Sequence, residues 1–429
     1  MINFRFKKII GWVSLTSLSI LICFLMSFPG VTQSSNIKQA KPVTILNEVW
    51  QKVNENFFDP KFNGVDWKAM QAKYEPLAKQ AKSIEEVSPV INQMLSELNT
   101  SHTRFYTKSE PAYYQLLGIF DRGGSFSQQI AKVLPNGKSE YTDIGIFTKL
   151  VDGKTFISGI IDGSPAAKAG LKVGDRIIGV DGSEYQPIKS FANKAGKEVQ
   201  ISIQRSSDPN SIKKITAIPK NLNPRTMFVD AMQDSIRIID RDRKKIGYIH
   251  IWSYAGDQYQ QQLVREITYG KLRNADALIL DLRDGWGGAD PNYLNIFTDK
   301  VPVLTQTYRD GRSTKLDWQW RKPVVMLVNN GTRSGKEILA YGFKKYNIGK
   351  VVGTKTAGAV VGGSPFFLQD GNLLYLAVVD VLVDGERLEG KGVIPDIEVP
   401  FTLEYAEGKD PQLDTAVNVL ASAVTNNTK

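Results

Sequence analysis

Residues 277–283 (ALILDLR) constrain the fold most strongly, because the segment opens with four consecutive apolar residues. A strand that is apolar on both faces is typical of a mostly parallel sheet covered by helices. Similar strand patterns at 245–253, 323–329 and 350–354 alternate with helical patterns such as 257–269. We therefore predict an α/β domain built of βαβ units in the second half of the chain.

The first half of the chain begins with three helical patterns, at 44–58, 66–82 and 84–98. Pro89 is expected to kink or restart the third helix, because proline cannot donate a backbone hydrogen bond. The glycines within 106–140 suggest loops or short strands there. The first helix has an apolar face at helical spacing, made of Leu46, Val49, Trp50 and Val53.

Short alternating strands dominate residues 141–222, which predicts a compact β-rich module with one short helix at SPAAKAG. Further along, residues 373–389 resemble a hairpin that turns at Asp384-Gly385-Glu386. The chain thus combines a helical part, a β-rich part and an α/β part.

Charge and composition exclude several classes of protein. The 429 residues carry a formal net charge of +10, from 54 Lys and Arg and 44 Asp and Glu. Arg5, Lys7, Lys8 and Lys38 lie in an acid-free N-terminal stretch, which leaves 50 positive against 44 negative charges elsewhere. This mild excess forms no basic stripe, so nucleic acid is not an expected partner. With 2 His and 1 Cys, neither a disulfide nor a zinc site with several His ligands is expected.

The N-terminus has the pattern of an export signal. Arg5, Lys7 and Lys8 precede an uncharged apolar run from residue 9 to residue 28. No clear cleavage site follows, so residues 1–34 are predicted to be a signal peptide or a membrane anchor. Ile22 before Cys23 argues against lipidation, and the positive flank places the body outside the cytoplasm.

The string GSPAAKAGLKVGDRIIGVDG at 163–182 closely resembles a PDZ domain. This resemblance implies that a peptide adds as a strand to a sheet edge, while backbone N–H groups hold its terminal carboxylate. The carboxylate loop would lie at Ile144, Gly145, Ile146 and Phe147, preceded by Asp143, although these residues depart from a plain Gly-Leu-Gly-Phe.

Two glycine-rich segments follow predicted strands and suggest catalysis. DLRDGWGG at 281–288 ends in Gly287 and Gly288, whose N–H groups could form part of an oxyanion hole or merely a tight turn. In NNGTRSGKEILAYG, Ser334 begins a helix, so it could be a nucleophile with the Gly335 N–H beside it. Alternatively, Ser334 and Glu337 form a simple capping box.

The remaining candidates are individually ambiguous. His102 lies just past a helix end in NTSHTRF, where a histidine is often structural. His250 alternates with Tyr248 and Trp252 along one strand face, which favours packing. Glu389 precedes a glycine turn and could be a solvated acid or could orient a histidine.

Together, the PDZ string, DLRDGWGG, NNGTRSGKE, VGTKTAG and EGKGVIPDIEV resemble the C-terminal processing (tail-specific) serine peptidases over about residues 44–402. One branch of that family uses a Ser–Lys dyad, but the lysine position corresponds here to Ala359. The tricorn-like and retinoid-binding-protein-like branch uses Ser–His–Glu. The resemblance assigns these roles to Ser334, His102 and Glu389.

The resemblance implies an exported serine endopeptidase without a cofactor or metal, acting through an acyl-enzyme on polypeptides with accessible C-terminal tails. The periplasm of a bacterial envelope is the expected location, with a membrane tether possible through residues 9–28. The alternatives are an inactive tail-binding scaffold, an esterase acting on small substrates, and a Ser–Lys peptidase using Lys355, since Lys336 is badly placed for a base.

The expected fold is a multidomain α/β protein with a crotonase-like catalytic core. Its predicted parts are the leader at 1–34, a helical domain at 40–110, a PDZ-like domain at 140–222, the peptidase core at 223–405 and a C-terminal segment at 406–429.

Overall fold

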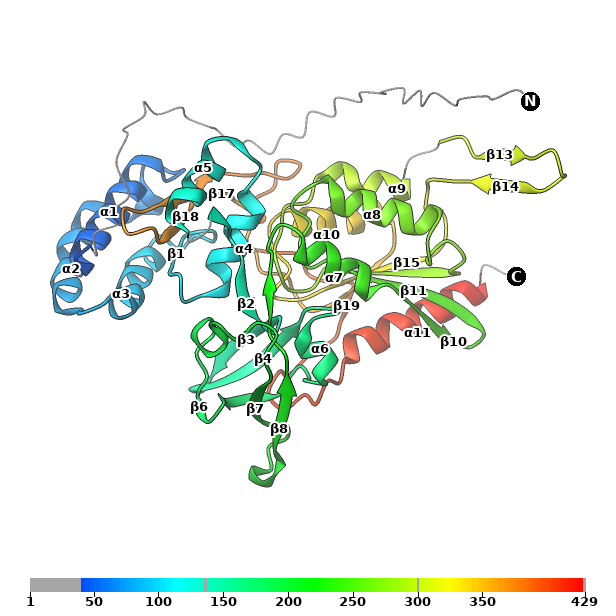
Figure 1. Ribbon diagram of the computed structural model, residues 1–429. Coiled ribbons are helices and arrows are strands. Elements are labelled where there is room, and N and C mark those ends of the chain that lie inside the picture. Colours follow the sequence, from blue (N-terminus) through cyan, green and yellow to red (C-terminus); the bar gives the residue numbers. More distant parts are fainter. Residues whose placement is uncertain (1–39, 135–136, 299–300, 427–429) are drawn as a thin grey trace, which may run out of the picture.

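The structure, a computed structural model, describes residues 40–134, 137–298 and 301–426. The predicted leader and Cys23 therefore lie outside the described residues. Helices α1–α3 form one end of the molecule, the peptidase sheet forms the other, and the PDZ-like module lies beside their junction (Figure 1). Within the described ranges, no helix has the length and apolarity needed to cross a membrane.

The three N-terminal helices are confirmed as α1 (Pro42–Asn56), α2 (Trp67–Gln80) and α3 (Ile84–Ser96). The predicted apolar face of α1 is buried at Leu46, Val49 and Val53. Helix α3 continues through Pro89, so the predicted restart is wrong. Four buried α3 side chains hold it in the helical core, and such packing outweighs propensity (Val87, Ile91, Met94 and Leu95).

Residues 106–140 contain two helices, α4 (Pro111–Phe120) and α5 (Gly124–Val133), where loops or short strands were expected. Gly118, which suggested a loop, lies inside α4. A Cβ at Gly118 would come within 2.4 Å of the Pro224 Cβ, so the glycine allows close packing rather than a turn.

The β-rich module is a sheet with strand order β3-β4-β5-β7-β8, and β6 pairs with β5 outside this path. Short helix α6 (Pro165–Ala169) is capped by the Ser164 hydroxyl and ends at Gly170, whose φ is +76°. Strands β2 (Tyr141–Asp143) and β9 (Lys220–Leu222) pair where the chain enters and leaves the module. The other strands are β3 (Ile146–Val151), β4 (Lys154–Ile160), β5 (Arg176–Val180), β6 (Ser183–Glu184), β7 (Val199–Gln204) and β8 (Ile212–Ala217), with 3-10 turns η3 (Lys189–Phe191) and η4 (Pro209–Ser211).

The peptidase sheet has the order β10-β11-β12-β15-β16-β19, and every neighbouring pair except β10–β11 is parallel. The predicted two-sided burial of residues 277–283 is confirmed, because all five residues of β12 (Ala277–Asp281) are buried. The other strands are β10 (Arg237–Arg241), β11 (Lys244–His250), β15 (Val324–Val328), β16 (Lys350–Gly353) and β19 (Ile397–Glu398).

Helices cover both faces of this sheet. One face packs against α7 (Met227–Ser235), α8 (Asp257–Thr268) and α10 (Gly335–Lys345). The other packs against α11 (Pro411–Asn426), so the C-terminal segment forms part of the core. Two short helical turns, η5 (Pro291–Leu294) and α9 (Asn295–Thr298), precede a projecting hairpin of β13 (Leu304–Thr307) and β14 (Ser313–Leu316) (Figure 1).

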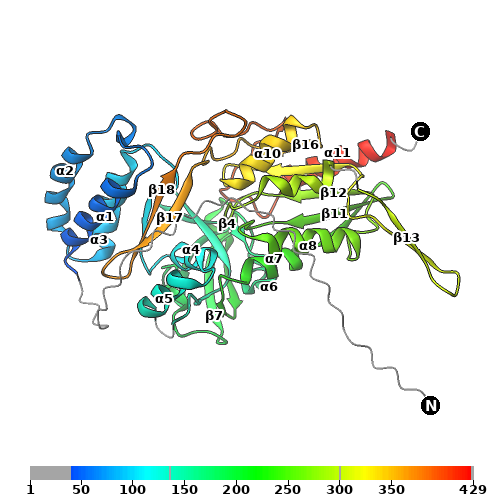
Figure 2. The same ribbon diagram turned by 90° about the horizontal axis from the view of Figure 1, so that it is seen from above.

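The predicted hairpin at 373–389 is partly wrong. Strand β18 (Leu373–Val379) pairs with β17 (Gly362–Phe367), which precedes it, and with β1 (Arg104–Tyr106) from the N-terminal part. Beyond the strand, the Asp384-Gly385 turn closes only the isolated bridge between Val383 and Glu386. This sheet lies between the N-terminal helices and the peptidase core (Figure 2).

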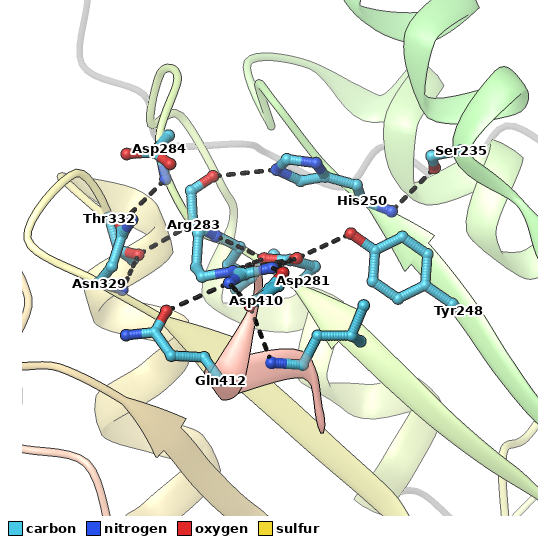
Figure 3. A network of polar contacts seen from close by, with 12 residues as sticks. Ser235, Tyr248, His250, Asp281, Arg283, Asp284, Asn329, Thr332, Asp410 and Gln412 are labelled. Carbon is cyan, nitrogen blue, oxygen red and sulfur yellow. Dashed lines mark hydrogen bonds and ion pairs between the residues drawn. The ribbon is translucent and has the colours of Figure 1, made fainter. Parts of the chain in front are cut away.

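Arg283 connects the end of strand β12 to the start of α11 (Figure 3). Its guanidinium donates to Asp281 at 2.6 Å and to Asp410 at 2.7 Å. Asp281 is fully buried and also accepts from the Tyr248 hydroxyl at 2.8 Å. Asp281 therefore depends on Arg283 for compensation of its charge.

Arg283→Ala should lower the free energy of unfolding by about 3–5 kcal/mol, because it leaves the Asp281 carboxylate buried without its cation. The matched control is Arg312→Ala on the projecting hairpin, where the ion pair with Asp310 is exposed and should contribute at most about 1 kcal/mol. Urea denaturation measures both variants, and equal small losses would contradict the structural role of Arg283.

Candidate active site

One cavity of about 2290 Å³ is lined by most of the residues predicted to be catalytic. It lies where β17, β18 and the end of the helical domain meet α10. Ser334, His102 and the three candidate oxyanion glycines (Gly287, Gly288 and Gly335) all contribute to its wall. The structure thus brings together residues that are distant in the sequence.

Ser334 lies between β15 and α10 in a strained backbone conformation, with φ 58° and ψ −133°. A positive φ is rare for a residue with a side chain, and it persists only where the surroundings enforce it. The Ser334 N–H donates to the Ala359 carbonyl at 2.8 Å, which is one such constraint. Residues held in such conformations cluster at functional sites.

Glu337 supplies the second constraint on Ser334. Its carboxylate accepts from the Ser334 N–H at 3.2 Å, which is the carboxylate half of the predicted capping box. The same carboxylate accepts from the Thr356 hydroxyl at 2.5 Å and from the N–H groups of Gly358 and Ala359 at 2.7 Å each. Ser334 is therefore the helix N-cap, and its cap is also part of the wall of the cavity.

His102 also has a positive φ, of 54°, in the turn after α3. Its Nδ1 lies 2.8 Å from the Ser101 hydroxyl, and its ring lies 5.4 Å from the Tyr375 ring. Burial, together with the charge of Arg333, lowers the pKa of His102 to about 4. The imidazole is consequently neutral at pH 7, which is the form that a general base requires.

Glu389 reaches His102 through Ser101 rather than by direct contact. The Ser101 N–H and hydroxyl donate to the two Glu389 oxygens at 2.8 and 2.9 Å. A hydroxyl has one proton, so while it donates to Glu389 it can only accept from His102. This arrangement places the imidazole proton on Nδ1 and leaves Nε2 with a free lone pair. The N–H of Val360 also donates to Glu389, at 2.6 Å.

Ser101 is a candidate functional residue that the sequence alone did not indicate. The only signal was its position beside His102 in a segment rich in hydroxyl groups. Neighbouring side chains in an extended chain point apart, so this spacing does not predict a contact. The turn at His102 changes the direction of the chain and allows the contact.

The oxyanion candidates are closely packed around Ser334. A Cβ at Gly287 would lie 2.4 Å from the Ser334 Cβ and 3.1 Å from its Oγ, so only glycine fits there. Gly288 has a φ of +97°, and its Cβ position is equally blocked, by Ala255. Among the described residues, no assigned hydrogen bond uses the N–H of Gly287, Gly288 or Gly335.

The two lysines considered as alternative bases are badly placed. Lys336 is fully buried, and its Nζ donates to the carbonyls of Asp284 at 2.6 Å and Ile251 at 3.1 Å. Burial lowers the pKa of Lys336 to about 7. Lys355 is exposed and does not line the cavity, whereas Ala359 does.

His250 is a packing residue, as its strand position predicted. Its Nε2 lies 3.1 Å from the Arg283 carbonyl (Figure 3), and its ring lies 4.0 Å from the Trp252 ring. On the PDZ-like side, its Nδ1 lies 3.6 Å from Asp162 and Phe147 stacks on Trp252. Burial opposes the charged form, but the carboxylates of Asp281 and Asp162 raise the pKa of His250 overall.

The predicted peptide-binding loop lies at the start of β3. Ile144 and Ile146 are buried in the module's own core, and Phe147 contacts the peptidase core through Trp252. Gly145 has a φ of +81°, and its Cβ position is blocked by Ser164. Strand β3 is an edge strand, as strand addition by a peptide requires.

No group of three side chains capable of holding a metal ion occurs among residues 40–134, 137–298 and 301–426.

Three family models match the chain in the order of its structural parts. Residues 39–96 match the tricorn protease C1 domain, residues 156–205 a PDZ domain, and residues 245–399 peptidase family S41. Residues 245–399 therefore form a domain of peptidase family S41.

Curated relatives agree with this assignment. A carboxyl-terminal-processing protease of Synechocystis sp. is 25% identical over 89% of this chain and 87% of its own length. Tricorn protease homolog 1 of Streptomyces coelicolor is 24% identical over 89% of this chain, which spans only 35% of that relative. Among solved structures, the photosystem II D1 C-terminal processing protease has a TM-score of 0.50 at 20% identity, covering 86% of this chain and 98% of its own, which supports the shared fold.

Ser101→Ala should reduce kcat of this S41 peptidase by about 10–100-fold, because it breaks the connection between Glu389 and His102. Ser96→Ala, at the exposed end of α3, is the matched control and should leave kcat unchanged. Peptide hydrolysis and circular dichroism measure activity and folding. A fully active, folded Ser101→Ala enzyme would show that the connection has no catalytic role.

Proposed function

We propose that the chain is a serine endopeptidase that cleaves polypeptides near accessible C-terminal tails. Ser334 is the nucleophile, and His102 removes its proton through Nε2 and returns it to the leaving amine. Glu389, acting through Ser101, stabilises the imidazolium that forms. The observation that carries this proposal is the hydrogen-bonded series from Glu389 through Ser101 to His102, beside the cavity that contains Ser334.

The N–H groups of Gly335 and of Gly287 or Gly288 are proposed to hold the oxyanion formed when Ser334 attacks the scissile carbonyl. Each such donor contributes about 3–4 kcal/mol to the transition state in characterised enzymes. Collapse of the tetrahedral intermediate forms an acyl-enzyme on Ser334 and releases the amine. Water, activated by His102, then hydrolyses the ester.

We also propose that the protein acts outside the cytoplasm, in a bacterial envelope. This rests on the N-terminal sequence alone, where basic residues precede the apolar run from 9 to 28. The sequence is equally compatible with cleavage of this segment and with its retention as a tether.

Ser334→Ala and His102→Ala should each reduce hydrolysis of casein by at least about 10⁴-fold while folding is retained. The Ser334 hydroxyl and the His102 imidazole both take part in cleavage of the peptide bond. Lys355→Ala should retain full activity, because this exposed lysine does not line the cavity. A large loss in Lys355→Ala with an active His102→Ala would identify the Ser–Lys design instead. Absence of hydrolysis by the unaltered protein, with peptide binding retained, would identify a scaffold, and cleavage of simple esters but not peptides would identify an esterase.

A further inference from the structure

Arg333, the residue before the candidate nucleophile, also lines the cavity. Its guanidinium lies over the Trp286 ring, 5.9 Å from the centroid, and its Nε is buried without a hydrogen-bond partner. Among the described residues, no carboxylate lies within ion-pair distance of Arg333. Its charge nevertheless reaches the site, because it contributes to the lowered pKa of His102.

The acidic side chains of the cavity already have partners. Asp380 pairs with Arg387 at 2.7 Å, Asp384 pairs with Lys345 at 2.7 Å, and Glu55 accepts a hydrogen bond from the Gln51 amide. Arg333 is thus a cation beside the nucleophile whose charge the protein itself leaves uncompensated. A buried donor without a partner destabilises the folded protein, and a bound acceptor removes this penalty.

We propose that Arg333 is a specificity residue that binds a carboxylate of the substrate close to the scissile bond. A carboxylate is the acceptor that best matches the planar fork of a guanidinium. The group is either the substrate's terminal carboxylate or a Glu or Asp side chain. The inference rests on the peptidase function proposed above and adds the chemistry that selects the substrate.

Two pairs of decapeptide mixtures, randomised over neutral residues, separate the two sources. The first pair has amidated ends and contains one Glu or one Gln at a random position. The second pair lacks both residues and ends in a free carboxylate or an amide. Within one of the two pairs, kcat/KM of the unaltered enzyme should be at least tenfold higher for the mixture that carries the carboxylate than for its neutral counterpart. Arg333→Gln should abolish that difference.

Arg104→Gln is the matched control, because Arg104 lines the same cavity but is paired with Glu110 at 2.8 Å. It should retain the preference. The proposal is overturned if neither pair shows a preference in the unaltered enzyme, or if Arg333→Gln retains it. Fluorescence anisotropy with Ser334→Ala repeats the comparison by binding alone, so the result does not depend on turnover.

A second inference comes independently from the PDZ domain. Asp143 immediately precedes the loop predicted to hold a terminal carboxylate, and its side chain is buried. Its Oδ1 accepts from the Gly145 N–H at 2.6 Å, whereas its Oδ2 has no hydrogen-bond partner of good geometry. Burial raises the pKa of Asp143 to about 7, although the N–H groups of Gly145, Ile144 and Ile146 oppose this.

We infer that the Asp143 carboxylate occupies the place of the peptide carboxylate in this loop, so a substrate tail must displace it. The N–H groups that favour ionised Asp143 belong to the loop that the PDZ resemblance assigns to a peptide terminus. A single set of donors cannot serve both carboxylates at once. Binding of a substrate's C-terminal tail therefore requires the Asp143 side chain to move away from these N–H groups.

Binding is measured with the free-acid and amidated mixtures in an Arg333→Gln, Ser334→Ala background, which removes cleavage and the guanidinium proposed to bind a substrate carboxylate. Adding Asp143→Gly should tighten free-acid binding at least tenfold and leave amide binding unchanged. Asp143→Asn should give a smaller gain, because an amide oxygen competes less well than a carboxylate for N–H donors.

Asp152→Gly, in the exposed turn between β3 and β4, is the matched control and should change neither affinity. Thermal melting establishes folding, and Asp143→Asn decides the question if Asp143→Gly does not fold. Free-acid binding that stays unchanged in the folded Asp143 variants overturns the inference. This result would leave the peptidase function untouched, because no variant is compared by turnover.

Discussion

The buried carboxylate of Glu337 is the interaction on which the candidate site depends. It binds the Ser334 N–H on one side and the loop at 356–359 on the other. The adjoining Val360 N–H holds Glu389, which in turn holds Ser101 beside His102. Glu337, whose position in the sequence predicted a helix cap, thus acts with the Ala359 carbonyl to maintain the backbone strain at Ser334. Burial raises the pKa of Glu337, and the four hydrogen-bond donors around its carboxylate oppose this rise.

Local sequence patterns correctly predicted helices and strands whose apolar residues recur at regular spacing. They failed where contacts with distant segments determine the local structure. Three elements were predicted because the apolar pattern that identifies each lies within its own segment: the helices at 44–58 and 84–98 and the buried strand at 277–283. Helix α4 was missed because Gly118 serves close packing against Pro224, which lies far along the chain. The partner of β18 was predicted wrongly because nothing in the sequence of residues 373–389 indicates pairing with β1 and β17.

The site was predictable in its composition but not in its connections. Ser334, His102 and the glycines were identified through resemblance, and they do line one cavity. The hydrogen bonds of Ser101 to His102 and Glu389 depend on the turn at His102. Lys336 is held away from the cavity by three backbone carbonyls that accept hydrogen bonds from its Nζ. The PDZ module is fixed to the peptidase core by similar long-range contacts, with Phe147 and Asp162 meeting Trp252. Such contacts join residues about a hundred positions apart, beyond the reach of any local pattern.

The pairing of β1 with β18 has a consequence for biosynthesis. Phe105, three residues after His102, lies in register with Leu374, so the histidine is anchored by a segment synthesised some 270 residues later. Glu389 is made later still. A nascent chain that is still emerging from the ribosome therefore lacks the assembled candidate site until residues near its end have joined those near its start. The candidate site is therefore completed only by residues from both ends of the described fold.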